Sequence, residues 1–213
     1  MAYDSHESQA IRPFRADRLT ALHQPLGENK DAMLTELQNR KLLKLFCMYD
    51  GDRDGFLVCQ DFEKIASKLA TIKNLGSRSP KFMMLRERMV KAWKNLLKQA
   101  DASGDKKISL EEWLAYHDEV LSDRATYTAE VQAVMELIFD MFDTDGNGTI
   151  CAQEWAELFQ VYNIHPAYAP STFKQLDANQ DGCLSKDEVL ALIDEFFCGD
   201  NAGAIANAMF GPY

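Results

Sequence analysis

The sequence predicts an all-α protein built from four copies of one helix–loop–helix unit. Four 12-residue segments align without gaps, beginning at residues 50, 101, 143 and 177. In each segment, acidic, amide or hydroxyl side chains stand at places 1, 3 and 5, an aliphatic residue at place 8, and Asp or Glu at place 12. Apolar residues four and one places before each segment, and one and four places after it, have the spacing of the inner face of an amphipathic helix. Each segment is therefore predicted to be a loop between an entering and an exiting helix.

The loop pattern is that of the EF-hand calcium site, D-x-[DN]-x-[DN]-G-x5-E. The four segments read DGDRDGFLVCQD, DASGDKKISLEE, DTDGNGTICAQE and DANQDGCLSKDE. Ca²⁺ takes six to eight oxygen ligands, and such a loop turns side chains 1, 3 and 5 inward, adds the place-7 carbonyl, often a water at place 9, and closes with place 12. One match could arise by chance on a polar turn, but four in register indicate a repeat.

The expected ligands stand at places 1, 3, 5, 7 and 12, for up to four Ca²⁺ ions. They are Asp50, Asp52, Asp54, Phe56 and Asp61; Asp101, Ser103, Asp105, Lys107 and Glu112; Asp143, Asp145, Asn147, Thr149 and Glu154; and Asp177, Asn179, Asp181, Cys183 and Glu188. The place-8 residues are expected to join the loops of each pair through a short antiparallel β-bridge. They are Leu57, Ile108, Ile150 and Leu184.

The acidity of the chain is concentrated in these loops. The net charge is −10, with 33 acidic and 23 basic residues. Thirteen of the 33 acidic residues are expected ligands, which leaves 20 acidic residues against 23 basic ones. Four Ca²⁺ ions would bring the net charge from −10 to −2. The charge pattern therefore favours metal binding and argues against nucleic acid, which needs a basic face.

The third and fourth loops fit the pattern best, since they have Gly148 and Gly182 at the sharp turn and a long Glu at place 12. A thiol is a poor ligand for a hard cation, so we expect a water in place of the Cys151 side chain at place 9. Cys183 at place 7 is expected to use its carbonyl, with its thiol pointing away.

The first and second loops depart from the pattern in different ways. Asp61 is one methylene shorter than Glu and is expected to reach the ion with one oxygen, which favours six-fold coordination and a mixed Ca²⁺/Mg²⁺ site. The second loop has Lys106 where the turn needs a positive φ. That conformation costs a non-Gly residue about 1–2 kcal/mol, or roughly tenfold in affinity. We expect the second loop to bind, as the weakest of the four.

The loop spacings of 51, 42 and 34 residues indicate two pairs packed into one compact unit. The predicted organisation is an N-terminal extension over residues 1–30, a first pair over 31–125, a second pair over 126–198, and a tail over 199–213 that docks on the core. In the extension, Ile11, Phe14, Leu19 and Leu22 could dock or fray. Gly76 and Pro80 break the chain before a long entering helix. Met83 and Met84 on that helix are expected in the core.

Composition excludes several other classes. No run approaches the roughly 20 apolar residues of a membrane span. The first residues lack the continuous apolar stretch of a signal peptide, and five cysteines without paired spacing suggest reduced thiols. We expect a cytoplasmic, monomeric protein that is not an enzyme, because no nucleophile–base pair, phosphate loop or zinc spacing is present.

The C-terminal stretch LIDEFFCGDNAGAIANAMFGPY, the long first-pair spacing and APSTFKQLDANQDGCLSKDE together resemble the sarcoplasmic calcium-binding protein family, with calexcitin and calerythrin as relatives. The resemblance covers about residues 34–213 and implies a compact, all-helical cytosolic Ca²⁺/Mg²⁺ buffer. Members commonly have a degenerate loop, whereas this chain keeps oxygen ligands in all four.

Two other functions remain open at this point. A calcium sensor would expose an apolar groove to a protein target, although the stretch AIANAMF could fill such a groove from within the chain. Calcium-regulated photoproteins and luciferin-binding proteins also resemble this architecture. Trp113, Tyr116 and His117 have suitable side chains for their cavity, and His23 and His165 are available.

Overall fold

The fold is a set of four helix–loop–helix units, and a helix precedes and follows each of the four predicted loops. The computed structural model describes residues 34–212, so the predicted extension with Ile11, Phe14, Leu19, Leu22 and His23 lies outside the described residues. The helices are α1 Glu36–Tyr49, α2 Cys59–Ile72, α3 Pro80–Ala100, α4 Leu110–Ser122, α5 Arg124–Tyr127, α6 Ala133–Phe142, α7 Ala152–Val161, α8 Ala169–Leu176 and α9 Lys186–Cys198. A π-helical turn, Thr128–Gln132, joins α5 to α6, and 3-10 turns lie at Pro166–Tyr168 and Ile205–Ala208.

Helix starts are set by capping side chains. The Thr35 hydroxyl accepts a hydrogen bond from the Gln38 N–H at 3.2 Å, and the Gln38 side chain returns to the Thr35 N–H at 2.9 Å. Before α3, the Ser79 hydroxyl accepts from the Phe82 N–H at 3.2 Å, and Pro80 occupies the first turn, where its missing N–H is not needed.

Two short antiparallel β-bridges join the loops in pairs. β1 (Phe56–Leu57) pairs with β2 (Ile108–Ser109), and β3 (Thr149–Cys151) pairs with β4 (Cys183–Ser185). The place-8 residues face each other in the register Leu57 to Ile108 and Ile150 to Leu184, and all four are buried. The predicted fold class, all-α with four EF-hands in two β-bridged pairs, is confirmed.

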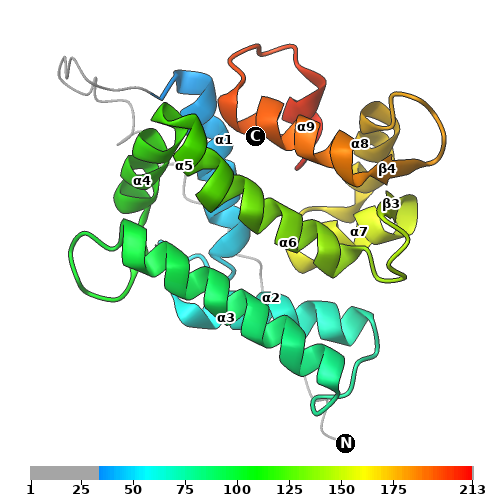
Figure 1. Ribbon diagram of the computed structural model, residues 1–213, viewed down its shortest axis with the longest axis horizontal. Coiled ribbons are helices and arrows are strands. Elements are labelled where there is room, and N and C mark those ends of the chain that lie inside the picture. The colour runs from blue at the N-terminus through cyan, green and yellow to red at the C-terminus, as the bar shows by residue number, and fades with distance from the viewer. Residues whose placement is uncertain (1–33, 213) are drawn as a thin grey trace, which may run out of the picture. The chain divides into compact units, whose positions relative to one another are not determined.

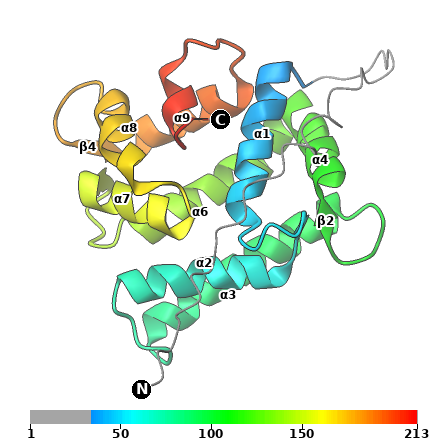
Figure 2. The same cartoon turned by 180° about the vertical axis from the view of Figure 1, so that it is seen from behind.

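The two pairs share one core. α2 and α3 lie side by side in the first pair, and α6 runs between that pair and α9 (Figures 1 and 2). Across the pairs, Tyr49 of α1 packs edge-on against Tyr162 with ring centroids 5.6 Å apart. Helices α1 and α4 are tied by a hydrogen bond from the Trp113 indole N–H to the Leu42 carbonyl at 3.0 Å. Burial of these aromatic side chains contributes the largest single increments of apolar area to the core.

A buried lysine connects α1 to the end of α9. Lys41 is only 1% exposed, and its ammonium donates to the Gly199 carbonyl at 2.9 Å and lies over the Phe196 ring. Beyond Gly199 the chain turns back, so that Ala206, Met209 and Phe210 are buried. The C-terminal segment therefore packs on the same helix that it leaves.

One core prediction was wrong. Met83 and Met84 are 51% and 50% exposed, whereas Leu85 and Met89 of the same helix are buried. The buried residues of α3, such as Leu85, Met89 and Trp93, share one face of the helix, and Met83 and Met84 lie on the opposite face. No helix among residues 34–212 is long and apolar enough to cross a membrane.

Candidate metal centres

All four loops share one hydrogen bond between the sharp turn and the first carboxylate. The backbone N–H at place 6 donates to Oδ2 of the Asp at place 1: Gly55 to Asp50 at 3.0 Å, Lys106 to Asp101 at 3.1 Å, Gly148 to Asp143 at 2.9 Å and Gly182 to Asp177 at 3.1 Å. Place 6 has a positive φ in every loop, including 65° at Lys106. The second loop therefore has the same turn as its siblings, although it lacks the glycine.

The acidic residue at place 12 also caps the exiting helix. One of its oxygens accepts from the N–H of place 9: Val58 to Asp61 at 3.0 Å, Ser109 to Glu112 at 2.9 Å, Cys151 to Glu154 at 3.1 Å and Ser185 to Glu188 at 2.9 Å. Sequence reasoning gave place 9 only a water-mediated role and missed this cap. The signal was present, since SLEE and SKDE have the spacing of capping boxes.

The third loop gathers its carboxylates most closely. Asp143, Asp145 and Glu154 each present an oxygen, and these oxygens lie within 4.8 Å of one another. Glu154 is held in this position because its Oε1 accepts from both the N–H and the hydroxyl of Thr144, at 2.9 and 2.7 Å. The Thr144 hydroxyl in turn accepts from the Lys73 ammonium of α2 at 3.1 Å. A residue of the first pair thus supports the closing ligand of the third loop.

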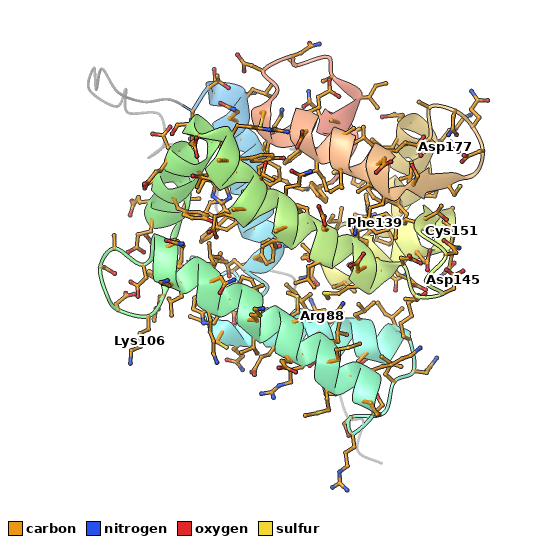
Figure 3. The ribbon with its side chains drawn as sticks, in the orientation of Figure 1. Arg88, Lys106, Phe139, Asp145, Cys151 and Asp177 are labelled. Carbon is orange, nitrogen blue, oxygen red and sulfur yellow. The ribbon has the colours of Figure 1, made fainter. Side chains whose placement is uncertain are left out.

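The fourth loop lies beside the third, as the labels on Asp145, Cys151 and Asp177 show (Figure 3). The Asn179 amide donates to Asp181 Oδ2 at 3.0 Å and to Glu188 Oε1 at 2.9 Å, which brings places 3, 5 and 12 together. Asp177 Oδ1 is buried and has no hydrogen-bond partner among residues 34–212, so a cation would satisfy it. Places 5 and 12 offer carboxylate oxygens and place 3 an amide oxygen, as a hard cation requires.

The expectation that the Cys183 thiol points away was wrong. Its sulfur lies 3.0 Å from Asp181 Oδ1, to which the thiol donates. The reason is the turn itself, since the side chain at place 7 stands next to that at place 5. In the third loop the hydroxyl of Thr149 makes the equivalent contact with Asn147 Oδ1 at 2.7 Å. The thiol therefore lies against an expected ligand residue.

In the second loop, Glu112 reaches across to the opposite side of the site. Its Oε1 accepts from the Ser103 N–H at 3.0 Å, and hydrogen bonds led by that from the Ser109 N–H lower the pKa of Glu112 to about 2. Asp101 Oδ1 accepts from the Ser103 hydroxyl at 3.4 Å. The Lys106 side chain is exposed and points outward from the loop (Figure 3). The predicted ligand side chains at places 1, 3 and 12 are therefore linked in one cluster.

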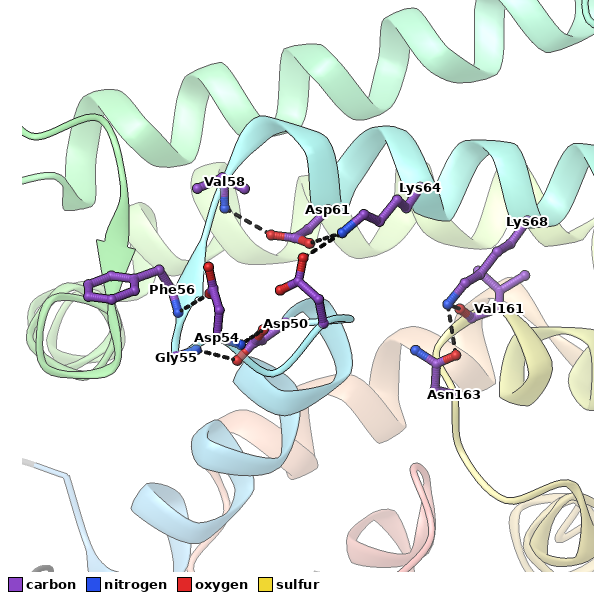
Figure 4. A network of polar contacts seen from close by, with 11 residues as sticks. Asp50, Asp54, Gly55, Phe56, Val58, Asp61, Lys64, Lys68, Val161 and Asn163 are labelled. Carbon is purple, nitrogen blue, oxygen red and sulfur yellow. Dashed lines mark hydrogen bonds and ion pairs between the residues drawn. The ribbon is translucent and has the colours of Figure 1, made fainter. Parts of the chain in front are cut away.

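The first loop differs because a lysine contacts it. Asp50, Asp52 and Asp54 present oxygens within 4.8 Å of one another, but Asp61 is not part of this group. The Lys64 ammonium lies 2.7 Å from Asp52 Oδ2 and 3.2 Å from Asp61 Oδ1 (Figure 4). The hydrogen bond from Lys64 lowers the pKa of Asp52, whereas burial raises that of Asp50. Sequence reasoning missed Lys64, which stands three residues beyond the 12-residue pattern.

A cavity of about 430 Å³ lies between the two pairs. Its lining includes Trp113, Tyr116 and His117 of α4, with Glu130 from the π-helical turn and Phe197 from α9. His117 Nδ1 donates to the Trp113 carbonyl at 2.8 Å, because a carbonyl oxygen only accepts, and burial lowers the pKa of His117 to about 4. The imidazole is therefore neutral at pH 7.

His165 does not join this cavity. It lies before the 3-10 turn at Pro166–Tyr168, where its Nδ1 accepts from the Ala167 N–H at 3.2 Å. Of the histidines that the structure describes, only His117 lines the cavity.

Comparison with known proteins agrees with this architecture. Residues 131–194 match the family of EF-hand domain pairs. Calerythrin from Saccharopolyspora erythraea is 26% identical over 169 residues, covering 78% of this chain and 96% of that protein. A luciferin-binding protein from Renilla reniformis is 29% identical over 178 residues, covering 81% and 92%.

Among solved structures, a sarcoplasmic calcium-binding protein from amphioxus has a TM-score of 0.69 at 20% identity. The match covers 84% of this chain and 99% of that one, and it shows a shared fold. Together with the loop geometry, these similarities agree with the expectation of a calcium-binding protein. The chain therefore contains an EF-hand domain pair over residues 131–194 and is similar to calerythrin and to a sarcoplasmic calcium-binding protein.

Proposed function

We propose that this protein is a cytosolic Ca²⁺/Mg²⁺ buffer in which each of the four loops binds one divalent ion. The ligands would be the residues at places 1, 3, 5, 7 and 12 of each loop. The shared turn, the capping carboxylates and the oxygen donors support this assignment. The third and fourth loops would bind most tightly, because each has a place-12 glutamate that extends across the site and carboxylate or amide side chains at places 1, 3 and 5.

The observation that carries the buffer role is the position of the C-terminal segment. Met209 and Phe210 are buried, and the Phe210 ring packs edge-on against Phe196 of α9 with centroids 5.2 Å apart. The turn Ile205–Ala208 contacts both α8 and α9, the helices of the fourth hand. A sensor exposes the apolar face of such helices to a target when calcium binds. Here the same chain covers part of that face.

A dye that fluoresces on apolar surfaces tests this role during a Ca²⁺ titration in excess Mg²⁺. A buffer keeps dye fluorescence nearly constant while calcium binds. Phe210→Asp should expose the covered face and give the signal of an open groove, whereas Ile205→Asp, at an exposed position of the same segment, should not. A large calcium-driven rise of dye fluorescence in the unaltered chain would show a sensor instead.

Ion stoichiometry tests the metal sites directly. Calorimetric titration with Ca²⁺, with and without Mg²⁺, should show four ions bound. Mg²⁺ should lower the apparent Ca²⁺ affinity most at the first loop, because Asp61 is the short residue at place 12. The fourth and weakest step should belong to the second loop, whose place-3 residue Ser103 offers a hydroxyl where the other loops offer a carboxylate or an amide oxygen. A total of three ions, together with an unchanged chemical shift of the Lys106 amide in a ¹H–¹⁵N spectrum, would remove the second loop from the proposal.

A second function is favoured by the cavity between the pairs. Its volume of about 430 Å³ and its aromatic lining suit a small aromatic ligand, and a relative is named a luciferin-binding protein. Neutral His117 and the Tyr116 hydroxyl provide polar groups there. Under this reading, the protein binds a luciferin-like molecule and calcium alters its affinity.

Titration with coelenterazine, followed by quenching of tryptophan fluorescence, tests the second function. Trp113 lines the cavity, so binding there should quench it in a 1:1 titration. Ala133→Phe adds bulk to an exposed residue of the lining without adding a tryptophan and should weaken binding, whereas Ala125→Phe on α5 lies outside the lining and should not. Equal quenching in both variants would place the ligand elsewhere, and no saturable quenching would leave the buffer as the function.

A further inference from the structure

The first loop has a basic residue that its three siblings lack at the same place. Lys64 stands at place 15, counted from Asp50, on the first turns of α2. The equivalent residues are Ala115, Glu157 and Ala191. Of the four loops, only the first therefore has an ammonium group at place 15.

Lys64 contacts two expected ligands at once. Its ammonium is 2.7 Å from Asp52 Oδ2, at place 3, and 3.2 Å from Asp61 Oδ1, at place 12 (Figure 4). These residues belong to opposite sides of the ion shell, one in the loop and one on α2. An ammonium that bridges them lies against oxygens that a divalent ion would need.

Asp61 makes this arrangement possible. Its side chain is fully buried, and its two oxygens accept from the Val58 N–H and from Lys64. In the other loops the longer glutamate extends its second oxygen across the site, to Ser103, Thr144 or Asn179. The shorter Asp61 makes no such contact, and Lys64 neutralises the oxygen instead. A buried carboxylate needs a partner of this kind.

The lysine is also able to leave. Its side chain is 37% exposed, and a four-carbon stem with a strongly hydrated head can swing into water. One helical turn further on, Lys68 points away from the loop and donates to Asn163 Oδ1 at 2.7 Å (Figure 4). Lys68 is thus a lysine of similar exposure on the same helix that touches no ligand.

We propose that Lys64 is a tethered counter-ion of the first loop, which competes with divalent cations for Asp52 and Asp61 and is displaced when an ion binds. This inference rests on the proposed function, in that it takes the first loop to be an ion site. Lys64 determines the affinity of that site without being a ligand. Its ammonium opposes the ion both by occupying ligand oxygens and by its charge.

The test uses the full chain and reads each loop separately. In a ¹H–¹⁵N spectrum, the place-6 amides of Gly55, Lys106, Gly148 and Gly182 each report one loop during a Ca²⁺ titration, because each donates to a place-1 carboxylate. Lys64→Met removes the charge and keeps the apolar stem. The midpoint at Gly55 should move to lower Ca²⁺ by about three- to thirtyfold, the range for a partly exposed ion pair plus one nearby charge. The midpoints at Gly148 and Gly182 should stay unchanged.

Two further variants separate competition from general electrostatics. Lys64→Arg keeps the charge and should leave the Gly55 midpoint close to its original value. Lys68→Met removes a neighbouring charge without freeing a ligand, and should move the Gly55 midpoint less than twofold. Thermal unfolding in chelator checks that each variant is folded.

The outcomes are distinct for the inference and for the proposed function. An unchanged Gly55 midpoint in Lys64→Met, or an equal change in Lys68→Met, overturns the inference and leaves the four-site proposal intact. If Ca²⁺ shifts the Gly55 amide in Lys64→Met but not in the unaltered chain, the inference is supported, and Lys64 then blocks the first loop completely. No binding at Gly55 in either protein overturns the inference and removes the first loop from the proposed ion sites, while Gly148 and Gly182 still report the others.

Discussion

Replacing Lys106 by glycine tests which state of the protein contains the strain of the second loop. Lys106 has a φ of 65°, a left-handed conformation that costs a non-Gly residue about 1–2 kcal/mol. The Lys106 N–H donates to Asp101 Oδ2 at 3.1 Å, and the Lys107 N–H donates to Asp105 Oδ1 at 2.8 Å. Both bonds are made within the chain, so the turn does not depend on an ion for its conformation. The strain should therefore be present in the free and in the ion-bound protein alike.

Because the strain is present in both the free and the ion-bound protein, its relief should change stability more than affinity. Glycine relieves about 1–2 kcal/mol of strain, but its greater freedom in the unfolded chain offsets about 0.5–1 kcal/mol. The free energy of unfolding should rise by about 0.5–1 kcal/mol, which for a domain of this size raises Tm by roughly 2 °C. The Ca²⁺ affinity of the second loop should change by less than about threefold. Strain confined to the bound state would instead give roughly tenfold.

The assay compares Lys106→Gly with Lys106→Gln, which removes the charge and keeps a left-handed non-Gly residue. Thermal unfolding in chelator gives Tm of the free protein, and the amide of residue 106 gives the midpoint of the second loop. A tenfold tighter midpoint in the glycine variant relative to the glutamine variant, with an unchanged Tm, would refute the reasoning. The strain would then arise only when the ion binds.

Three further predictions concern other residues. Asp61→Glu should let place 12 chelate with two oxygens and raise the Ca²⁺ over Mg²⁺ preference of the first loop, measured by calorimetry in each ion; an unchanged preference would contradict the short-ligand explanation. Thr144→Val removes the hydroxyl that positions Glu154 and should weaken the third loop by about fivefold; Thr71→Val, whose hydroxyl donates to the Ser67 carbonyl of α2, is the control, and equal effects of the two would argue against positioning. Burial lowers the pKa of His117 from 6.5 to about 4, so the unfolded chain binds the proton first and stability falls as pH drops through this window. About 2 kcal/mol should be lost between pH 7 and pH 5 in urea unfolding, a loss that His117→Gln should abolish.

The features that follow a fixed period were predictable from the sequence. The register of the two β-bridges follows from the place-8 residues, because an aliphatic side chain at that place is buried only if it faces its equivalent in the paired loop. The positive φ of Lys106 follows in the same way from its place in the turn. Both properties are local to a repeated unit, so three copies predict the fourth.

Features that depend on contacts between units were not predictable. Met83 and Met84 are apolar residues next to the buried Leu85, but they lie on the outer face of α3, and which face is covered depends on how the helices pack. The cavity is lined by residues from several helices of both pairs, and its volume depends on how those pairs pack. Lys73 reaches Thr144 across 71 positions of sequence, which no local pattern reveals.

Each of the two loops of the first pair is affected by a lysine, Lys64 beside the first loop and Lys106 within the second, and the two lysines act in different ways. Lys106 is strained in the turn, and since its bonds lie within the chain, the strain bears on folding more than on binding. Lys64 is unstrained and contacts ligand oxygens directly, so it bears on binding more than on folding. The residue that violates the consensus is therefore expected to matter less for calcium affinity than one that the consensus does not include. Because Leu57 and Ile108 join the two loops, displacement of Lys64 by an ion in the first loop also acts on the bridge that holds the second. Binding at the first loop should for this reason favour binding at its partner.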